Sequence, residues 1–168
     1  EGRPFVLYGG RREGAKGWEA LLHGFADTVR REDVDLLLVT YGTGPVEPPP
    51  DVAHRVVDLG LVDDGTRDDA MAAAAAYVQP SALESFSRTV MEAWLAGTPV
   101  IANGASAVVR WHVERSGAGL LYADAAELEQ ALRFVAEAPD AAAGLARPGR
   151  AYVLEHYTWP DTLDRMEA

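Results

Sequence analysis

The sequence predicts a Rossmann-like α/β fold, a three-layer α/β/α sandwich around a mostly parallel sheet of about six strands. Short apolar runs that end in Gly or Ser alternate with longer segments of helical periodicity, a pattern typical of a parallel sheet covered by helices. The chain has 168 residues, of which 48% are hydrophobic. It can therefore bury the core of one domain.

The strands are predicted at the apolar runs, which cover residues 5–8, 36–41, 56–59, 77–79, 100–102 and 120–122. In sheets of this kind, ligands bind beyond the carboxyl ends of the strands, where loops run into helix N-termini. We therefore expect the functional residues in the loops that follow the strands.

The helices are predicted from apolar residues at three- and four-residue intervals, over residues 18–29, 63–77, 87–96 and 125–138. The first has a polar face with Glu19, Asp27 and Arg30, and the third is ended by Gly97 and Pro99. Residues 48–50, three prolines, are expected to form a rigid connector.

The two ends of the chain also carry signals. Residues 1–4 lead at once into the first apolar run, and we interpret this abrupt start as a domain boundary close to a linker. The tail from Tyr152 to Met166 is expected to be helical, with a break at Trp159 and Pro160. Residues 1–168 are thus expected to form one domain whose upstream partner domain is missing.

Composition excludes several classes of function. A formal net charge of -11 argues against a broad basic face for nucleic acid or anionic lipid, so any phosphate must be held by a few local groups. Without cysteine there are no disulfides, thiolate metal sites or cysteine nucleophiles. No apolar run approaches the ~20 residues that span a bilayer. The first residues do not resemble a signal peptide, and a soluble bacterial cytoplasmic protein is expected.

The first loop of interest, residues 9–17, combines glycines with basic side chains. Glycines allow close approach of the backbone to a ligand, and Arg or Lys supplies charge for phosphate. The loop is not a Walker A motif, because Lys16 is followed by Gly17 instead of Ser or Thr. It is not a dinucleotide fingerprint either, since the second strand ends at Tyr41 and Gly42 without an acidic residue. Taken alone, a glycine-rich turn with solvated charges explains it equally well.

The second loop, which follows the strand at residues 77–79, carries Glu84 and leads into a helix that is expected to begin between Ser85 and Ser87. The free backbone N–H groups at such a helix start can bind an anion, and a diphosphate would fit there. Glu92 lies in the second turn of that helix, where a carboxylate can accept hydrogen bonds from ribose hydroxyls. An acidic residue there can also be a simple partner of the helix dipole.

Together these two loops resemble the donor site of family 4 (group 1) glycosyltransferases of the GT-B fold. The resemblance rests on Glu84 and Glu92 with seven residues between them, on the run from Gly97 to Ala102, and on Gly10-Arg11, four residues, then Lys16-Gly17 in the first loop. It extends over essentially the whole chain and matches only the family's carboxyl-terminal, donor-binding domain. The N-terminal acceptor-binding domain is absent from the chain.

The resemblance implies a role for each matched residue. Arg11 and Lys16 would hold the donor diphosphate and stabilise the departing nucleotide, and Glu84 would contact the donor sugar. Glu92 would bind the ribose, and Gly60 with Leu61 would lie beside the nucleobase. The implied donor-binding set as a whole is Gly10, Gly60, Leu61, Ser85, Phe86, Ser87, Thr89 and Glu92. Transfer with retention and without a metal or other cofactor is implied, and the four histidines of the chain form no recognisable ligand set.

The chain also departs from the family pattern. Ser85 and Ser87 stand where many members have glycine, and we expect their hydroxyls to cap the helix. Residues 103–107 lack the Glu that many members carry, and Trp111 and His112 are expected either to pack or to cover that surface. The function favoured is transfer of a hexose from a UDP or GDP sugar to an acceptor hydroxyl. The alternatives are a sugar-nucleotide epimerase-like domain and a non-catalytic nucleotide-sugar-binding domain.

Overall fold

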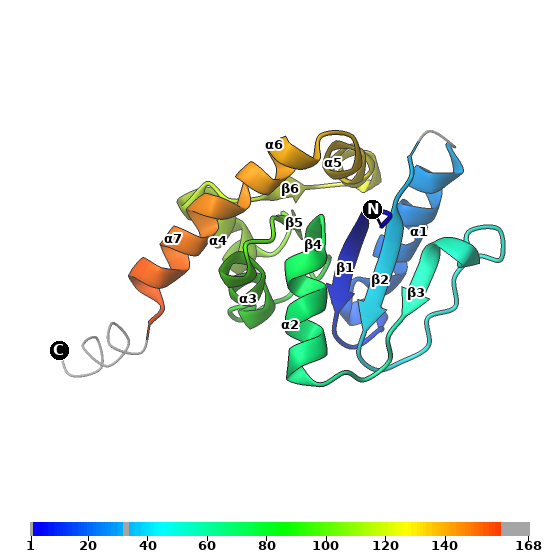
Figure 1. Cartoon of the computed structure of the whole chain (residues 1–168), viewed down its shortest axis with the longest axis horizontal. Helices are drawn as coiled ribbons and strands as arrows, with labels where there is room; N and C mark the ends of the chain where they lie inside the picture. The colour runs from blue at the N-terminus through cyan, green and yellow to red at the C-terminus, as the bar shows by residue number, and fades with distance from the viewer. Residues whose placement is uncertain (1, 32–33, 159–168) are drawn as a thin grey trace.

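The computed structural model describes residues 2–31 and 34–158, and within them six strands form one parallel sheet. The strands are β1 (Phe5–Gly9), β2 (Leu37–Tyr41), β3 (Val56–Asp58), β4 (Ala76–Gln79), β5 (Val100–Asn103) and β6 (Leu120–Tyr122). Their order in the sheet is β3-β2-β1-β4-β5-β6, and every neighbouring pair is parallel (Figure 1). The predicted fold class is confirmed, and all six strands lie within one residue of their predicted starts and ends.

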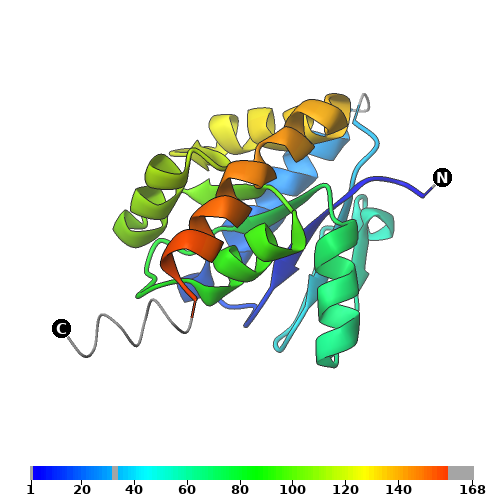
Figure 2. The same ribbon diagram turned by 60° about the vertical axis from the view of Figure 1, so that its left-hand side comes forward.

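Helices cover both faces of the sheet (Figure 2). They are α1 (Trp18–Arg30), α2 (Asp64–Ala73), α3 (Arg88–Ala96), α4 (Ala107–Ser116), α5 (Ala125–Glu137), α6 (Pro139–Gly144) and α7 (Ala146–His156), with short 3-10 turns at Gly14–Lys16 and Ala53–Arg55. Helices α1, α5 and α6 pack on one face, and α2, α3, α4 and α7 pack on the other.

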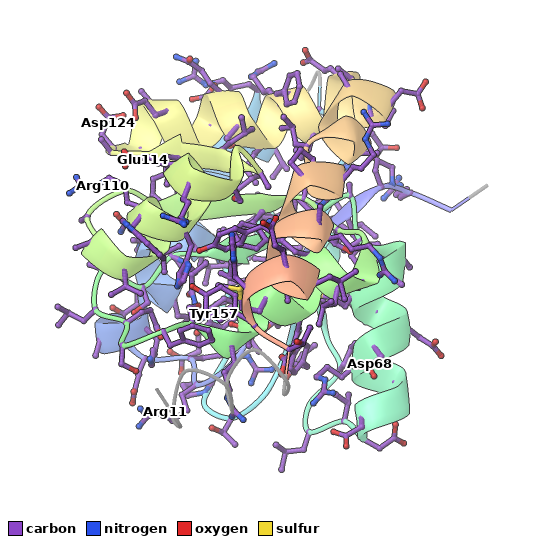
Figure 3. The ribbon with its side chains drawn as sticks, turned by 90° about the vertical axis from the view of Figure 1, so that its left-hand side faces the viewer. Arg11, Asp68, Arg110, Glu114, Asp124 and Tyr157 are labelled. Atoms are coloured by element: carbon purple, nitrogen blue, oxygen red, sulfur yellow. The ribbon has the colours of Figure 1, made fainter. Side chains whose placement is uncertain are left out.

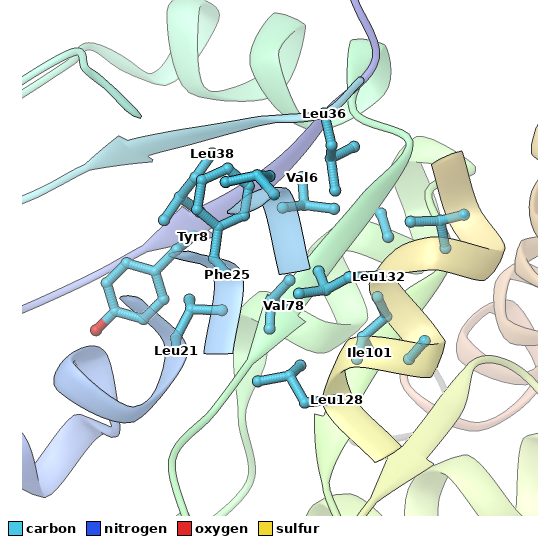
Figure 4. Packing of buried hydrophobic residues seen from close by; sticks show 14 of the residues in the cluster. Val6, Tyr8, Leu21, Phe25, Leu36, Leu38, Val78, Ile101, Leu128 and Leu132 are labelled. Carbon is cyan, nitrogen blue, oxygen red and sulfur yellow. The ribbon is translucent and has the colours of Figure 1, made fainter. Parts of the chain in front are cut away.

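The alternation of side chains along each central strand divides the core into two halves. In β1, Val6 and Tyr8 face α1 and α5, where Phe25 and Leu132 are fully buried (Figure 4). Leu7 lies on the opposite face, in the cluster that contains α3 and α7. Both halves are needed because a parallel sheet is stable only when each face is covered.

The strand order creates a switch point between β1 and β4. From β1 the chain continues through α1 to β2, whereas from β4 it continues through α3 to β5, on the other side. The loops after β1 and β4 therefore lead to opposite faces of the sheet and leave a crevice at the carboxyl edge between them.

Several helix predictions need correction. The predicted helix over residues 63–77 ends at Ala73, because the chain must extend into the buried strand β4. The helix predicted over 87–96 begins at Arg88. The tail helix is α7, which starts at Ala146 and ends at His156, so it begins earlier than predicted; the expected break at Trp159 and Pro160 lies outside the described residues. The prediction missed α4 and α6 altogether.

Two further expectations concern irregular and membrane segments. The three prolines at residues 48–50 lie in the connection between β2 and β3, in a stretch without helix or strand that precedes the 3-10 turn at Ala53–Arg55. Among residues 2–31 and 34–158, there is no helix of the length and apolar character that would carry the chain through a bilayer.

Candidate functional site

A cleft of about 320 Å³ lies at the switch point. The β1 loop and the β4 loop with the start of α3 contribute its lining, which consists of Tyr8, Gly9, Gly10, Arg11, Lys16, Gln79, Glu84, Arg88, Thr89 and Glu92. The four residues on which the sequence hypothesis depends most, Arg11, Lys16, Glu84 and Glu92, thus face one cavity although they come from two distant segments.

One ion pair joins the two loops across this cleft. Lys16 Nζ donates to Glu84 Oε1 at 2.9 Å. The Lys16 side chain is 31% exposed and that of Glu84 is 14% exposed, so the pair lies at the wall of the cleft and remains accessible to a ligand. A bound anion could therefore reach Lys16 by sharing or replacing the carboxylate of Glu84.

The two adjacent arginines of the β1 loop have different surroundings. Arg11 is largely exposed, lines the cleft and makes a solvent-accessible ion pair with Glu13 at 3.2 Å. In Figure 3 its side chain projects from the margin of the molecule. Arg12 is buried and turns away towards β2 and β3. Of these two arginines, only Arg11 is therefore placed to contact a ligand in the cleft.

The backbone of the β1 loop is held rigidly in this position. Tyr8 Oη donates to the carbonyl oxygen of Arg11 at 2.6 Å. Burial raises the pKa of Tyr8 to about 12, so this hydroxyl keeps its proton at neutral pH. At the end of the loop, Gly17 has a φ of 74°, and a Cβ there would lie 2.4 Å from the carbonyl oxygen of Pro80. The β1 and β4 loops can approach this closely only because residue 17 is glycine.

The β4 loop is fixed by a second contact, from β5. Asn103 Nδ2 donates to the same Pro80 carbonyl at 3.0 Å, while Asn103 Oδ1 accepts from the backbone N–H of Ala105 at 2.9 Å. The segment that lacks the Glu of the family pattern therefore supports the β4 loop through an amide side chain.

Helix α3 begins differently from the prediction. Ser87 is its N-cap, but in the left-handed region with a φ of 64°, and its side chain makes no capping bond. The Ser87 hydroxyl instead accepts from Gln79 Nε2 at 2.6 Å. The expectation that Ser85 and Ser87 cap the helix with their hydroxyls is wrong for Ser87, because its oxygen is hydrogen-bonded to Gln79 in β4. Ser85 is exposed. The amino end of α3 therefore has no side-chain cap to compete with an anion.

Five residues of the predicted donor-binding set lie outside the cleft lining. Ser85 is exposed, and Phe86 packs edge-on against His112 and Tyr157 on the other side of its loop. Gly60 and Leu61, expected beside the nucleobase, lie in the β3 loop, where Leu61 is 80% exposed. Ser87 is also absent from the lining and touches the site only through Gln79. Gly10 and Thr89 do line the cleft.

The sequence analysis did not select four of the lining residues, Tyr8, Gly9, Gln79 and Arg88. For two of them, the sequence position itself could have indicated a functional role. Arg88 is a basic residue in the first turn of a helix, where the dipole disfavours a cation unless an anion is present. Gln79 is a polar residue in a strand whose residues are all buried. Tyr8 read only as an ordinary strand residue, and Gly9 belonged to the first loop, residues 9–17, without being assigned a role there.

His112, which the sequence left between packing and recognition, is buried. Its Nδ1 lies 2.9 Å from Tyr152 Oη, and desolvation lowers its pKa below the usual 6.5. Trp111 beside it is 48% exposed, and it lines an apolar hollow with Phe86, Val108 and Tyr157. Within the part of the chain that the structure describes, no group of three or more His, Asp or Glu side chains could hold a metal ion.

The comparison with protein families decides the classification. Residues 3–137 match the family model for glycosyl transferases group 1. The chain belongs to this family. The phosphatidyl-myo-inositol mannosyltransferase of Mycolicibacterium smegmatis is 37% identical over 114 residues, which are 66% of this chain and 30% of that protein. The group 1 transferase chain described here thus spans less than a third of that relative's length.

Solved structures agree with the GT-B assignment. Sucrose-phosphate synthase from Thermosynechococcus elongatus superposes with a TM-score of 0.83 at 27% identity, covering 98% of this chain and 44% of that one. HepE of Anabaena, solved in complex with UDP and glucose, has a TM-score of 0.78 at 20% identity and covers 98% and 47%. The fold of this group 1 transferase chain therefore matches less than half of each of these longer chains.

Proposed function

We propose that the cleft between the β1 and β4 loops binds a nucleoside-diphosphate sugar, and that the protein containing this chain transfers the hexose to an acceptor hydroxyl with retention of anomeric configuration. The observation that carries the proposal is the convergence of Arg11, Lys16, Glu84 and Glu92 on one cavity at the switch point of the sheet. Acceptor binding belongs to a second domain outside this chain.

The charges in the cleft suit a diphosphate. Arg11 and Arg88 are exposed cations on its lining, and Lys16 adds a third that is shared with Glu84. The uncapped amino end of α3 supplies backbone N–H groups and the positive end of the helix dipole. Because the chain as a whole has a net charge of -11, such a local cluster of positive groups favours an anionic ligand at this cleft.

The chemistry follows from where charge develops during transfer. As the bond between the sugar and the diphosphate breaks, negative charge accumulates on the leaving phosphate oxygens. Arg11, Lys16 and the α3 amino end would stabilise that charge, which lowers the barrier without a metal ion. Glu84 would hold the sugar, and Glu92 would accept hydrogen bonds from the ribose. Because the acceptor is positioned by the second domain, the isolated chain should be nearly inactive.

The nucleotide is proposed to be UDP or GDP. Support for the nucleotide comes from the HepE structure, which holds UDP and glucose, while the name of the mannosyltransferase supports a hexose as the transferred sugar. In this chain a cleft of about 320 Å³ lies at the carboxyl edge of the sheet, where folds of this kind bind ligands, and this also supports the proposal.

Calorimetric titration of this chain with UDP and GDP tests the proposal. Binding is expected, and Arg11→Ala or Glu92→Ala should weaken it by about 1–3 kcal/mol through loss of charge-assisted hydrogen bonds. Arg3→Ala is the matched control, because Arg3 precedes β1 at the opposite edge of the sheet and pairs there with Asp35. Absence of binding at millimolar nucleotide, or equal losses in Arg3→Ala and Arg11→Ala, would contradict the assignment.

A further inference from the structure

Arg12, the buried neighbour of Arg11, ties the loops after β1, β2 and β3 together, and we propose that it is a positioning residue for the nucleoside half of the donor. The proposal rests on the proposed function of the cleft. The Arg12 side chain does not itself line the cleft.

The guanidinium of Arg12 uses donors on all three of its nitrogens. Its side chain is 2% exposed. Nε donates to Thr40 Oγ1 at 3.1 Å in β2, and Nη1 donates to the carbonyl oxygens of Gly42 and Gly44 at 3.3 and 2.7 Å in the β2 loop. Nη2 donates to the carboxylate of Asp58 at the end of β3. One side chain from the β1 loop is thus bonded to the two neighbouring strands and their loops.

Asp58 passes this connection on to the β3 loop. The oxygen Oδ1 that pairs with Arg12 also accepts the backbone N–H of Gly60 at 2.8 Å. The carbonyl of Gly60 in turn accepts the N–H of Gly42 at 2.8 Å. Since the Gly42 carbonyl accepts from Arg12, the four residues form a closed ring of hydrogen bonds. Loss of any one member loosens the β2 and β3 loops together.

The ring lies directly behind the cleft. Gly10, which lines the cleft, donates its N–H to the carbonyl of Tyr41 at 3.0 Å. At Gly42, with a φ of 125°, a Cβ would lie 2.0 Å from the carbonyl oxygen of Gly10. The β2 loop is therefore in backbone contact with the loop proposed to grip the diphosphate. A nucleotide that contacts both Arg11 and Gly60 would bridge two loops whose relative position the ring holds.

The residue types fit a positioning role. Arginine presents a rigid planar fork of donors, so it can hold several acceptors in a set arrangement, which a lysine ammonium cannot. A buried cation is stable only with a partner, and Asp58, whose side chain is 40% exposed, supplies the charge from the rim. The pair therefore orders loops in a region where glycines at positions 42, 44 and 60 all have positive φ.

The test compares nucleotide binding with binding of the diphosphate unit alone. Calorimetry measures UDP, GDP and inorganic pyrophosphate with wild type, Arg12→Met and Asp58→Asn. The affinity for the tighter-binding nucleotide should fall at least about tenfold in both variants, while that for pyrophosphate changes less than about twofold. Arg11→Met should weaken both ligands, and Arg12→Lys should not restore nucleotide affinity. If Arg12→Met does not fold, the same comparison with Asp58→Asn alone tests the proposal.

A second readout is independent of any ligand. Amide hydrogen exchange at Gly42 and Gly60 should be faster in Asp58→Asn than in wild type, while exchange at Leu21, which is bonded to Gly17 at the start of α1, stays the same. Unchanged exchange at the two glycines, or equal losses of nucleotide and pyrophosphate affinity, would overturn the inference. Failure of the wild type to bind either nucleotide would instead contradict the proposed function, and faster exchange would still show that the ring orders the loops.

Discussion

Lys16 Nζ lies 2.9 Å from Glu84 Oε1, and this pair joins the two loops that line the cleft. Both residues are proposed to contact the donor, Lys16 through the diphosphate and Glu84 through the sugar. Each side chain is therefore already bonded to the other at the point where the donor is proposed to bind. The donor must separate or share the pair, and its affinity includes that cost.

Glu84→Gln is expected to raise the affinity for UDP or GDP by about two- to tenfold, because it removes a negative charge from the cleft and releases Lys16, and partly exposed ion pairs are worth about 1 kcal/mol or less. Calorimetry on this chain measures the change. Glu92→Gln is the control with the same change of charge, and it should weaken binding because the acceptor for the ribose hydroxyls is no longer charged. Weaker binding in Glu84→Gln as well would show that Glu84 does not compete for Lys16.

Arg88 should act as a further cation for the diphosphate, because it lines the cleft and stands in the first turn of α3. Arg88→Met is expected to lower the affinity for UDP or GDP by about tenfold at low salt and by less at high salt, where exposed charges are screened. Titrations at two ionic strengths measure this. Arg110→Met, an exposed variant on α4, should have no effect. An equal effect at both salt concentrations would argue against a direct charge interaction.

Gly17→Ala should be markedly more destabilising than Gly97→Ala. Both glycines have positive φ at a helix end, 74° and 83°, but a Cβ at position 17 would lie 2.4 Å from Pro80 O, whereas at position 97 it meets nothing within 4 Å. We expect a loss of about 1 kcal/mol for Gly97→Ala from backbone strain alone, and about 2–4 kcal/mol for Gly17→Ala. Urea unfolding compares the two. Equal losses would mean that the loops can separate freely at Gly17.

The stability of the chain should depend on His112 at mildly acidic pH. Burial lowers its pKa below 6.5, so the unfolded chain takes up this proton more readily than the folded chain. Its contribution to stability is therefore complete above pH 6.5 and is lost as the pH falls through the lower pKa of the folded state. His112→Phe should flatten this part of the profile of melting temperature against pH. A profile that keeps its slope in the variant would assign it to other groups.

The strands could be predicted because each is a short apolar run ended by a turn residue, and Val6, Leu38, Val78 and Ile101 are buried as that pattern requires. Helix α1 was equally clear, since Leu21, Phe25 and Val29 recur on one face. Helix α4 was missed because its buried face is small and includes His112, whose burial depends on Tyr152 in a distant helix. Such tertiary partners are not visible in local periodicity.

For the site, the sequence grouped Arg11, Lys16, Glu84 and Glu92 correctly as neighbours, because the loops after β1 and β4 meet at a switch point in this fold. The motif spacing selected Arg11 by resemblance, but nothing in the sequence predicted that the adjacent Arg12 would be buried. The difference depends on Asp58 and on the carbonyls of the β2 loop, which become neighbours only after the sheet has formed. The individual roles of the lining residues stay predictions.

The most direct test of a donor cleft at the β1–β4 switch point is a backbone amide chemical-shift titration of the 15N-labelled chain with UDP and with GDP. For at least one nucleotide, the largest saturable shifts should fall on residues 10–17 and 84–92. Shifts confined to other surfaces, or none at millimolar nucleotide, would contradict the account.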